Sequence, residues 1–503
     1  MFRLRNNRCR TTLTIGIALL GLFFGGTREM SYIPVFCVFC LAFIFVLAAN
    51  GGFRCNLLKL SRFAPFWIGL ALAVYIVVQI LNPWLEFIHM DGYSAPRILD
   101  CFEFLPTSVF SADSSVDSYY ASIIAVLLAL VFSCALHIEI SSRDDCIYYA
   151  KVFFSVSTIL GACAICDSIF FRDSVYIWGI MDQSAGQHYG SFVYKNQCGA
   201  FLLMGLICGI SLCLSSMRFG HSIAKLTVYG IGIAINVASI FISRSVGSII
   251  FCVLILIVSV FVAAIRFQSL NLKISALAMV SIPVLALSLL LFYLGHSSVM
   301  ASFERLDNFI SGEADFDKKV RDLAGDRGKF KEIATEFILT GGDWKNSSPK
   351  NVSIQRIILG SGATSFGKIM RLRGAGDSYF HSKVYSSSLK PSAAITVPVH
   401  VHCDILEAVF EFGLAWLLVF IAMSVYFIKR MVRAKFWRSS FLSIQCAGIL
   451  LILIYSSSDI IFYNMFLFAA FCGLATIVFD YACIISGGTP LLQRHLRVSD
   501  SAQ

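Results

Sequence analysis

The sequence predicts an all-α polytopic membrane protein with about twelve transmembrane helices and one long external loop that forms a partly helical cap. The chain of 503 residues is 57% hydrophobic and only 14% charged. Its mean hydropathy of +0.78 is far above that of an ordinary soluble domain. The apolar residues gather in runs of about 20, the length that crosses a bilayer. Soluble folds are excluded, because no soluble core needs so many helices of that length.

Apolar runs follow one another along the chain with a single long interruption. Arginines precede the first run, but no small-residue cleavage site follows it, so we expect a retained helix rather than a signal peptide. The predicted spans are Thr11–Gly26, a run from Ser31, Phe63–Asn82, Tyr119–Ile138, Ile147–Phe170, Val193–Leu214, Ala224–Ile242, Ser245–Ile265, Ser275–Gly295, Asp404–Ile428, Phe441–Asp459 and Ile460–Ile485. The chain thus divides into a membrane part (1–295), a polar loop (296–403), a second membrane part (404–485) and a tail (486–503).

The distribution of positive charge orients these spans. Short loops of membrane proteins are rich in Lys and Arg on the cytoplasmic side. Five alternate loops or ends are basic, whereas Pro83–Ser118 holds Arg97 among acidic residues; only the turn Glu139–Asp145 is ambiguous. We therefore expect both termini in the cytoplasm and the polar loop outside. The net charge of +10 follows from this topology and does not indicate a nucleic-acid partner.

The 17 cysteines fall mainly inside apolar runs, where they act as small hydrophobic residues. Cys163 and Cys166 have a CxxC spacing, but a lipid-embedded helix lacks the loop geometry of a zinc or redox site. No metal site is therefore predicted. A disulfide between Cys101 and Cys403 is one option if both face outward, and the sequence leaves it open.

The segment Ser297–Gly413 is the only long polar stretch in the chain, so we expect it to hold the working residues. Within it, Gly328–Leu339 has apolar residues at helical spacing, which predicts a cap helix. The stretch Gly360–Phe366 resembles a phosphate-binding loop only superficially. It lacks the Lys-Ser/Thr ending and a preceding buried strand, so it is weak evidence for a nucleotide site.

His402 lies immediately before an apolar helix, where its side chain can reach both water and a substrate at the membrane surface. Histidine suits proton removal near neutral pH, although an isolated histidine at this depth is more often merely interfacial. Asp404, Glu407 and Glu411 follow at spacings that place them on one helix face. They either interact with the helix dipole or act in the site. His400 would point elsewhere in an extended segment.

Arg244 lies in a hinge, Ile242–Gly247, so short that two apolar runs meet almost without a loop. Leaving an arginine in lipid costs at least about 2.5 kcal/mol, so it either snorkels to the surface or binds an anion such as a lipid-linked phosphate. Arg327, just before the cap helix, is either a solvated charge or a second anion ligand. Arg305 has the same two interpretations, and Asn196 lies at the outer end of a helix.

Several short motifs occur in a characteristic order. They are Leu105-Pro106-Thr107-Ser108, Gly190-Ser191-Phe192, Asn196 with Gly199-Ala200, Ser243-Arg244, Glu304-Arg305-Leu306, Gly325-Asp326-Arg327, Gly360 to Phe366, and His402 with Asp404, Leu406, Glu411 and Gly413. Each is degenerate, but their order, spacing and topology cover most of the chain. Together they make the chain resemble the bacterial O-antigen ligase and polymerase family, multi-spanning glycosyltransferases that use polyprenyl-diphosphate-linked glycans.

The resemblance implies that His402 is the base that activates an acceptor hydroxyl, and that Arg244 and Arg327 hold the donor diphosphate. Supporting residues on the same motifs are Arg305, Asn196, His400, Asp404 and Glu411. Cys403 departs from the Asn or Ser common after the family's histidine. The resemblance further implies a bacterial inner membrane location, contact with membrane lipids, metal-independent chemistry without a cofactor, and a glycan, lipid A core or protein acceptor.

Two other classes remain as alternatives. A polysaccharide transporter would place polar residues on broken helices at the bilayer midplane, and the runs contain few such charges. A non-catalytic assembly protein would not need the arginines or His402. Within the enzyme class, the sequence does not separate a ligase from a repeat-unit polymerase or a protein O-glycan ligase.

Overall fold

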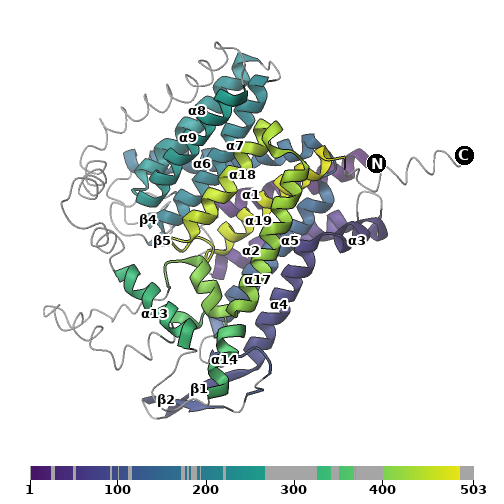
Figure 1. Ribbon diagram of the computed structural model, residues 1–503. Helices are drawn as coiled ribbons and strands as arrows, with labels where there is room; N and C mark the ends of the chain where they lie inside the picture. The colour runs from purple at the N-terminus through teal and green to yellow at the C-terminus, as the bar shows by residue number, and fades with distance from the viewer. Residues whose placement is uncertain are drawn as a thin grey trace, which may run out of the picture.

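A computed structural model gives the architecture of the chain (Figure 1). It describes residues 2–23, 29–48, 52–90, 93–99, 101–102, 104–110, 116–170, 176–177, 181–182, 190–192, 194–218, 222–266, 326–340, 350–367, 369 and 400–487. This part of the chain is almost entirely helical, as the sequence predicts. The strands are few and short, and all precede residue 183.

The bounds of the elements agree closely with the apolar runs. The helices before the polar loop are α1 (Phe2–Leu22), α2 (Glu29–Ala48), α3 (Phe53–Ser61), α4 (Ala64–Leu81), α5 (Val116–Glu139), α6 (Arg143–Phe170), α7 (Lys195–Arg218), α8 (Ile223–Ile242) and α9 (Val246–Arg266). The later helices are α13 (Asp326–Thr340), α14 (Lys350–Leu359), α17 (Asp404–Arg433), the 3-10 turn η3 (Phe436–Arg438), α18 (Ser440–Ser456) and α19 (Met465–Ile485). The strands are β1 (Pro83–Met90), β2 (Tyr93–Ile98), β3 (Ser108–Phe110), β4 (Tyr176–Ile177) and β5 (Met181–Asp182).

Eight of the described helices are long and apolar enough to cross a membrane: α4, α5, α6, α7, α8, α9, α17 and α19. A ninth span arises if α2 and α3, which meet at a bend of 112°, count as one. The predicted run Thr11–Gly26 overlaps α1, and Phe441–Asp459 overlaps α18, an apolar helix of 17 residues. The predicted run Ser275–Gly295 lies outside the described residues. The structure thus supports a multi-pass protein, while the number of twelve stays a prediction.

Helix α7 is the centre of the bundle. It packs against α6, α8, α9, α18 and α19, and its side chains are buried almost throughout. Small residues allow this packing: a Cβ on Gly205 would lie 2.0 Å from Ser157 Oγ, and one on Gly199 would lie 1.9 Å from Ser248 Oγ. Interhelical close approach of this kind is the usual way for membrane helices to associate. The first turn of α7 is thereby fixed relative to the start of α9.

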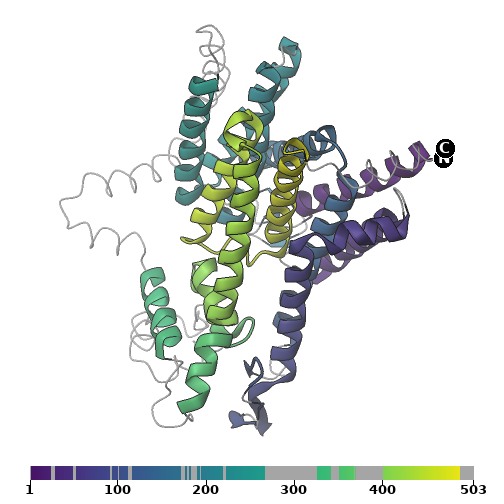
Figure 2. The same cartoon turned by 45° about the vertical axis from the view of Figure 1, so that its right-hand side comes forward.

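Helices α13 and α14 lie with β1 and β2 at one end of the bundle, which we call the cap end (Figures 1 and 2). The strands form a small sheet in the order β2-β1-β3, with Leu85 opposite Ile98 in the antiparallel pair. The helix predicted over Gly328–Leu339 is therefore present as α13, while its place in an external cap stays a prediction. Its Ile333 and Phe337 are buried against the first half of α17, and Phe337 lies 4.7 Å from the Phe410 ring. Burying each such side chain contributes roughly 1.5–3 kcal/mol.

Helix α17 is interrupted at Gly413, whose φ of 76° is outside the helical range. The break leaves carbonyl groups of the preceding turn without helical partners. The glycine-rich loop after α14 satisfies them: Ser361 N donates to Phe410 O at 2.9 Å, and Gly362 N donates to Glu411 O at 2.9 Å. This loop therefore stabilises the break in α17. Two of its backbone N–H groups donate to carbonyl oxygens of α17 and not to an anion. This agrees with the weak resemblance of the loop to a nucleotide-binding motif.

Candidate functional site

His402 lies where three segments meet at the cap end. It is in the left-handed region, with φ of 58°, one residue before the Cys403 N-cap of α17. The loop between α18 and α19 is held against this point by Asp404, whose Oδ2 accepts hydrogen bonds from Ile461 N at 2.8 Å and Phe462 N at 2.9 Å. The sequence prediction extended a helix through this loop from Ile460. The structure instead begins α19 at Met465, capped by Asn464.

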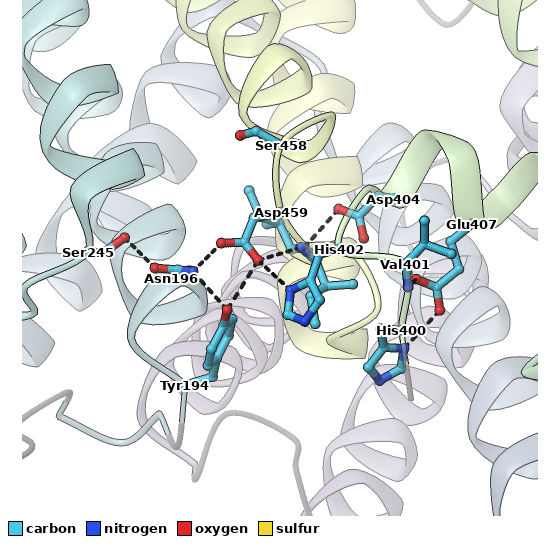
Figure 3. Close-up of polar contacts among 12 residues, drawn as sticks. Tyr194, Asn196, Ser245, His400, Val401, His402, Asp404, Glu407, Ser458 and Asp459 are labelled. Carbon is cyan, nitrogen blue, oxygen red and sulfur yellow. Dashed lines mark hydrogen bonds and ion pairs between the residues drawn. The ribbon is translucent and has the colours of Figure 1, made fainter. Parts of the chain in front are cut away.

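The imidazole of His402 faces the carboxylate of Asp459, with Nδ1 3.5 Å from Oδ1 (Figure 3). The side chain of Asp459 is 4% exposed and that of His402 is 24% exposed. The carboxylate also accepts hydrogen bonds from Tyr194 OH at 3.2 Å, from Ile460 N at 2.8 Å and from the Asn196 side-chain amide. These donors hold the buried carboxylate in place. A hydrogen bond from His402 Nδ1 to this carboxylate would leave Nε2 as the basic nitrogen.

Asn196 links this acid–base pair to the α8–α9 hinge. Its side-chain carbonyl accepts from Ser245 Oγ, and Ser245 Oγ lies 3.0 Å from Tyr455 OH. The amide can bridge the two groups because one end accepts while the other donates. Arg244 precedes Ser245, is exposed, and has a φ of 53°. The structure thus confirms the short hinge and connects the residue after Arg244, through Asn196, to Asp459.

His400 belongs to a separate pair. Its Nδ1 lies 2.8 Å from Glu407 Oε1, and Glu407 Oε2 accepts from Val401 N at 3.1 Å. The His400 ring also packs on Tyr463, at 3.9 Å between centroids. Burial, together with the nearby carboxylates, raises the pKa of Tyr463 above its usual value. The two histidines therefore have different partners (Figure 3). Residues two apart in an extended segment would share a side, so it is the left-handed backbone of His402, with φ of 58°, that separates them.

The start of α13 closes the site from another side. The Phe330 ring lies 6.4 Å from the His402 ring, and Lys331 Nζ donates to Ser457 O at 3.3 Å. Arg327 is the second residue of α13, one turn before these two residues, and its side chain lies outside the described atoms. Arg305 lies outside the described residues. The contacts of the two arginine side chains are therefore not described, and their role as anion ligands stays a prediction.

A cavity of about 700 Å³ opens beside the site. Its polar end is formed by Asp404, Glu407 and Glu411, so the three carboxylates do share one helix face. Gln197 and Asn464 line the same end, joined by a hydrogen bond of 3.1 Å. The rest of the wall is mainly apolar, with side chains of α4, α5, α17, α18 and α19 that include Leu72, Ile76, Trp416, Leu417 and Phe420, and it also contains Ser122, Ser456 and Tyr463. His402 does not line this cavity, but Asp404, two residues later, does. The cavity fits an amphipathic molecule.

Cys403 and Cys101 both pack in the apolar cluster between α13 and α17. No disulfide joins them. Burial raises the pKa of the Cys403 thiol, so this side chain stays neutral and packs as a small apolar group. The residue that departs from the family pattern therefore has a packing role here.

Of the predicted residues, the structure brings together His402, Asn196, Asp404 and the hinge that carries Arg244. It places His400 and Glu411 beside the adjoining cavity. Asp459 and Tyr194 were missed. The sequence held one signal for Asp459, a carboxylate between two adjoining apolar runs. It held no signal for Tyr194, which lies two residues before Asn196.

No protein-family profile matches this chain, and no curated protein sequence matches it. The arrangement itself can hold an imidazole base against a buried carboxylate, with an arginine on the neighbouring hinge. The described residues also contain no group of three or more His, Cys, Asp or Glu side chains gathered as metal ligands.

Proposed function

We propose that this protein is a membrane glycosyltransferase that transfers or polymerises glycan from a polyprenyl-diphosphate donor, at the outer face of the bacterial inner membrane. The observation that carries the proposal is the contact of His402 with the buried carboxylate of Asp459 at the cap end. A carboxylate that fixes one ring nitrogen of a histidine leaves the other as an oriented general base. The resemblance of the motifs to the O-antigen ligase and polymerase family supports the same activity.

In the proposed reaction, the acceptor hydroxyl oxygen attacks the anomeric carbon of the donor. His402 Nε2 takes the hydroxyl proton, and Asp459 stabilises the imidazolium that forms. The bond between the anomeric carbon and the diphosphate oxygen breaks, and the diphosphate leaves with the electron pair. Arg244 and Arg327 neutralise the charge that develops on the leaving group, which is the role that a guanidinium fills best.

The two sides of His402 differ in charge, and this suggests where each substrate binds (Figure 3). Ser245 and Asn196, next to Arg244, lie on one side, and the carboxylates of Asp404 and Glu407 lie on the other. These carboxyl groups can hydrogen-bond to sugar hydroxyls but supply no positive charge to a diphosphate. We therefore assign the hinge side to the donor diphosphate and the carboxylate-lined cavity to the acceptor and its apolar part.

The test is a transfer assay with purified protein and a polyprenyl-diphosphate-linked glycan in the presence of EDTA. Parallel reactions contain a lipid A core acceptor, a protein acceptor, or the donor alone. Product on the lipid A core identifies a ligase, product on the protein identifies a protein ligase, and a ladder from the donor alone identifies a polymerase. His402→Ala and Arg244→Ala proteins that are folded and still transfer glycan normally would refute the proposal.

A further inference from the structure

A second cavity, of about 780 Å³, lies at the end of the bundle opposite to His402. It is bounded by the first turns of α6, α8 and α18, by the last turns of α7 and α19, and by η3. Its described wall contains five cationic residues against one carboxylate, Asp144. The cations are Arg143, Lys151, Lys225, Lys435 and Arg438. A cavity with this excess of positive charge is suited to an anion.

The positive-inside rule explains basic loops, but it does not explain why these residues surround one cavity. Lys151 is the clearest case, because it lies inside α6, about 12 Å along the axis from the first residue of that helix. Lys435 is held in the left-handed region, with φ of 50°, immediately after α17. Lys151 therefore reaches the cavity from within a helix rather than from a loop. Lys435 reaches it from a residue whose backbone has an uncommon conformation.

A buried hydroxyl group also points to a ligand. Ser440 is only 3% exposed and lines the cavity, and its Oγ has no hydrogen-bond partner among the described atoms. It is the first residue of α18, whose N-cap Ser439 accepts a hydrogen bond from Leu442 N. A buried hydroxyl without a partner costs roughly 1–3 kcal/mol. A phosphate oxygen at this helix N-terminus would accept its hydrogen bond and interact favourably with the helix dipole.

The remaining wall contains Ser215, Ser216 and Ser439 together with apolar side chains, and it reaches the surface that the helices present to lipid. Ile147, Leu212 and Ile485 line the cavity with Val228, which is 64% exposed on α8. A free inorganic anion gains nothing from contact with apolar side chains. A phospholipid can place its head group against the cations and the start of its acyl chains against the apolar part of the wall. Basic pockets between membrane helices are known to bind anionic head groups. We propose that this cavity binds the phosphate of an anionic phospholipid from the surrounding leaflet.

The experiment measures lipid selectivity directly, without any glycan substrate. Full-length protein is reconstituted in phosphatidylcholine vesicles that contain a trace of spin-labelled phosphatidylglycerol or spin-labelled phosphatidylcholine, and the motionally restricted fraction of each label is compared. The test variant is Lys151→Gln/Lys225→Gln/Lys435→Gln. The matched control, Arg54→Gln/Arg62→Gln/Arg433→Gln, removes three exposed cations from the same end of the bundle that do not line the cavity.

We expect the wild type and the control to bind phosphatidylglycerol in preference to phosphatidylcholine. In the test variant this preference should be at least tenfold lower, since each interfacial cation strengthens the binding of an anionic lipid about fivefold. Ser440→Ala should lower the motionally restricted fraction of both labels and leave the preference unchanged, because both lipids carry the phosphate that would accept this hydrogen bond. Equal preference in the test variant and the wild type, or equal loss in the control, would overturn the proposal. Displacement of the lipid by millimolar inorganic phosphate, but not by chloride of equal ionic strength, would assign the cavity to a free anion instead.

Discussion

Replacing Asp459 with asparagine tests the candidate base most directly. The substitution keeps the shape of the side chain and removes its charge. At the 3.5 Å separation of His402 Nδ1 and Asp459 Oδ1, an imidazolium and a carboxylate attract each other by about 5 kcal/mol at an effective dielectric constant of 20. Only part of this stabilisation is lost, because asparagine still accepts a hydrogen bond. We expect a loss of about 3–4 kcal/mol, or 10²- to 10³-fold in the transfer rate.

The substitution also disturbs folding, and this effect has to be separated from catalysis. In the wild-type protein the Asn196 side-chain amide donates a hydrogen bond to the Asp459 carboxylate. In Asp459→Asn the new side-chain amide faces this donor. Two facing donors cost roughly 1–3 kcal/mol of stability. The double variant Asn196→Asp/Asp459→Asn restores one donor and one acceptor but moves the charge away from His402. We expect it to recover the melting temperature without recovering the transfer rate.

The assay is initial-rate glycan transfer at saturating donor, with the melting temperature of each detergent-solubilised protein measured in parallel. Tyr194→Phe serves as a milder control, since it keeps the Asp459 charge and removes only the hydrogen bonds of the Tyr194 hydroxyl, one of 3.2 Å to Asp459 and one of 2.9 Å from Asn196; we expect a loss of less than about tenfold. An Asp459→Asn protein that is folded and transfers glycan within twofold of the wild-type rate would refute the role assigned to this carboxylate.

Further expectations concern the histidines, the hinge and the break in α17. His402→Ala should reduce transfer by at least about 10²-fold, and His400→Ala by far less, because His400 pairs with Glu407 outside the acid–base pair; single-turnover assays compare the two. Arg244→Lys should raise the KM for the diphosphate donor, because a lysine cannot bind phosphate bidentately. Gly413→Ala, at a φ of 76°, should lower the melting temperature strongly, because a Cβ would lie 2.2 Å from a backbone carbonyl oxygen, whereas Gly487→Ala, at a φ of 77° with open space, should lower it only by the backbone strain. Transfer should continue in EDTA, since the proposed charge neutralisation uses arginines.

Much of the site could be predicted because its signals are local. The hinge around Arg244 follows from two apolar runs that adjoin, and the shared face of Asp404 and Glu407 follows from helical spacing. The position of His402 before α17 follows from the start of the apolar run. Each of these features depends on residues within a few positions of one another, and the structure agrees with all of them.

Asp459 could not be assigned in this way. It lies 57 residues after His402 and ends a run that reads as one helix followed by another. Its role depends on the loop between α18 and α19, which Asp404 holds in place through two backbone N–H groups. The basic cavity likewise depends on tertiary structure, because its cations come from three separate segments.

The sequence by itself determined the membrane class and most helix bounds, because hydropathy and helical periodicity are properties of neighbouring residues. Only the tertiary structure decided which carboxylate faces His402, which histidine pairs elsewhere, and that the glycine-rich loop stabilises the break in α17. These contacts join segments far apart in the chain. Packing around the buried α7 helix brings them together, and no local pattern encodes that packing.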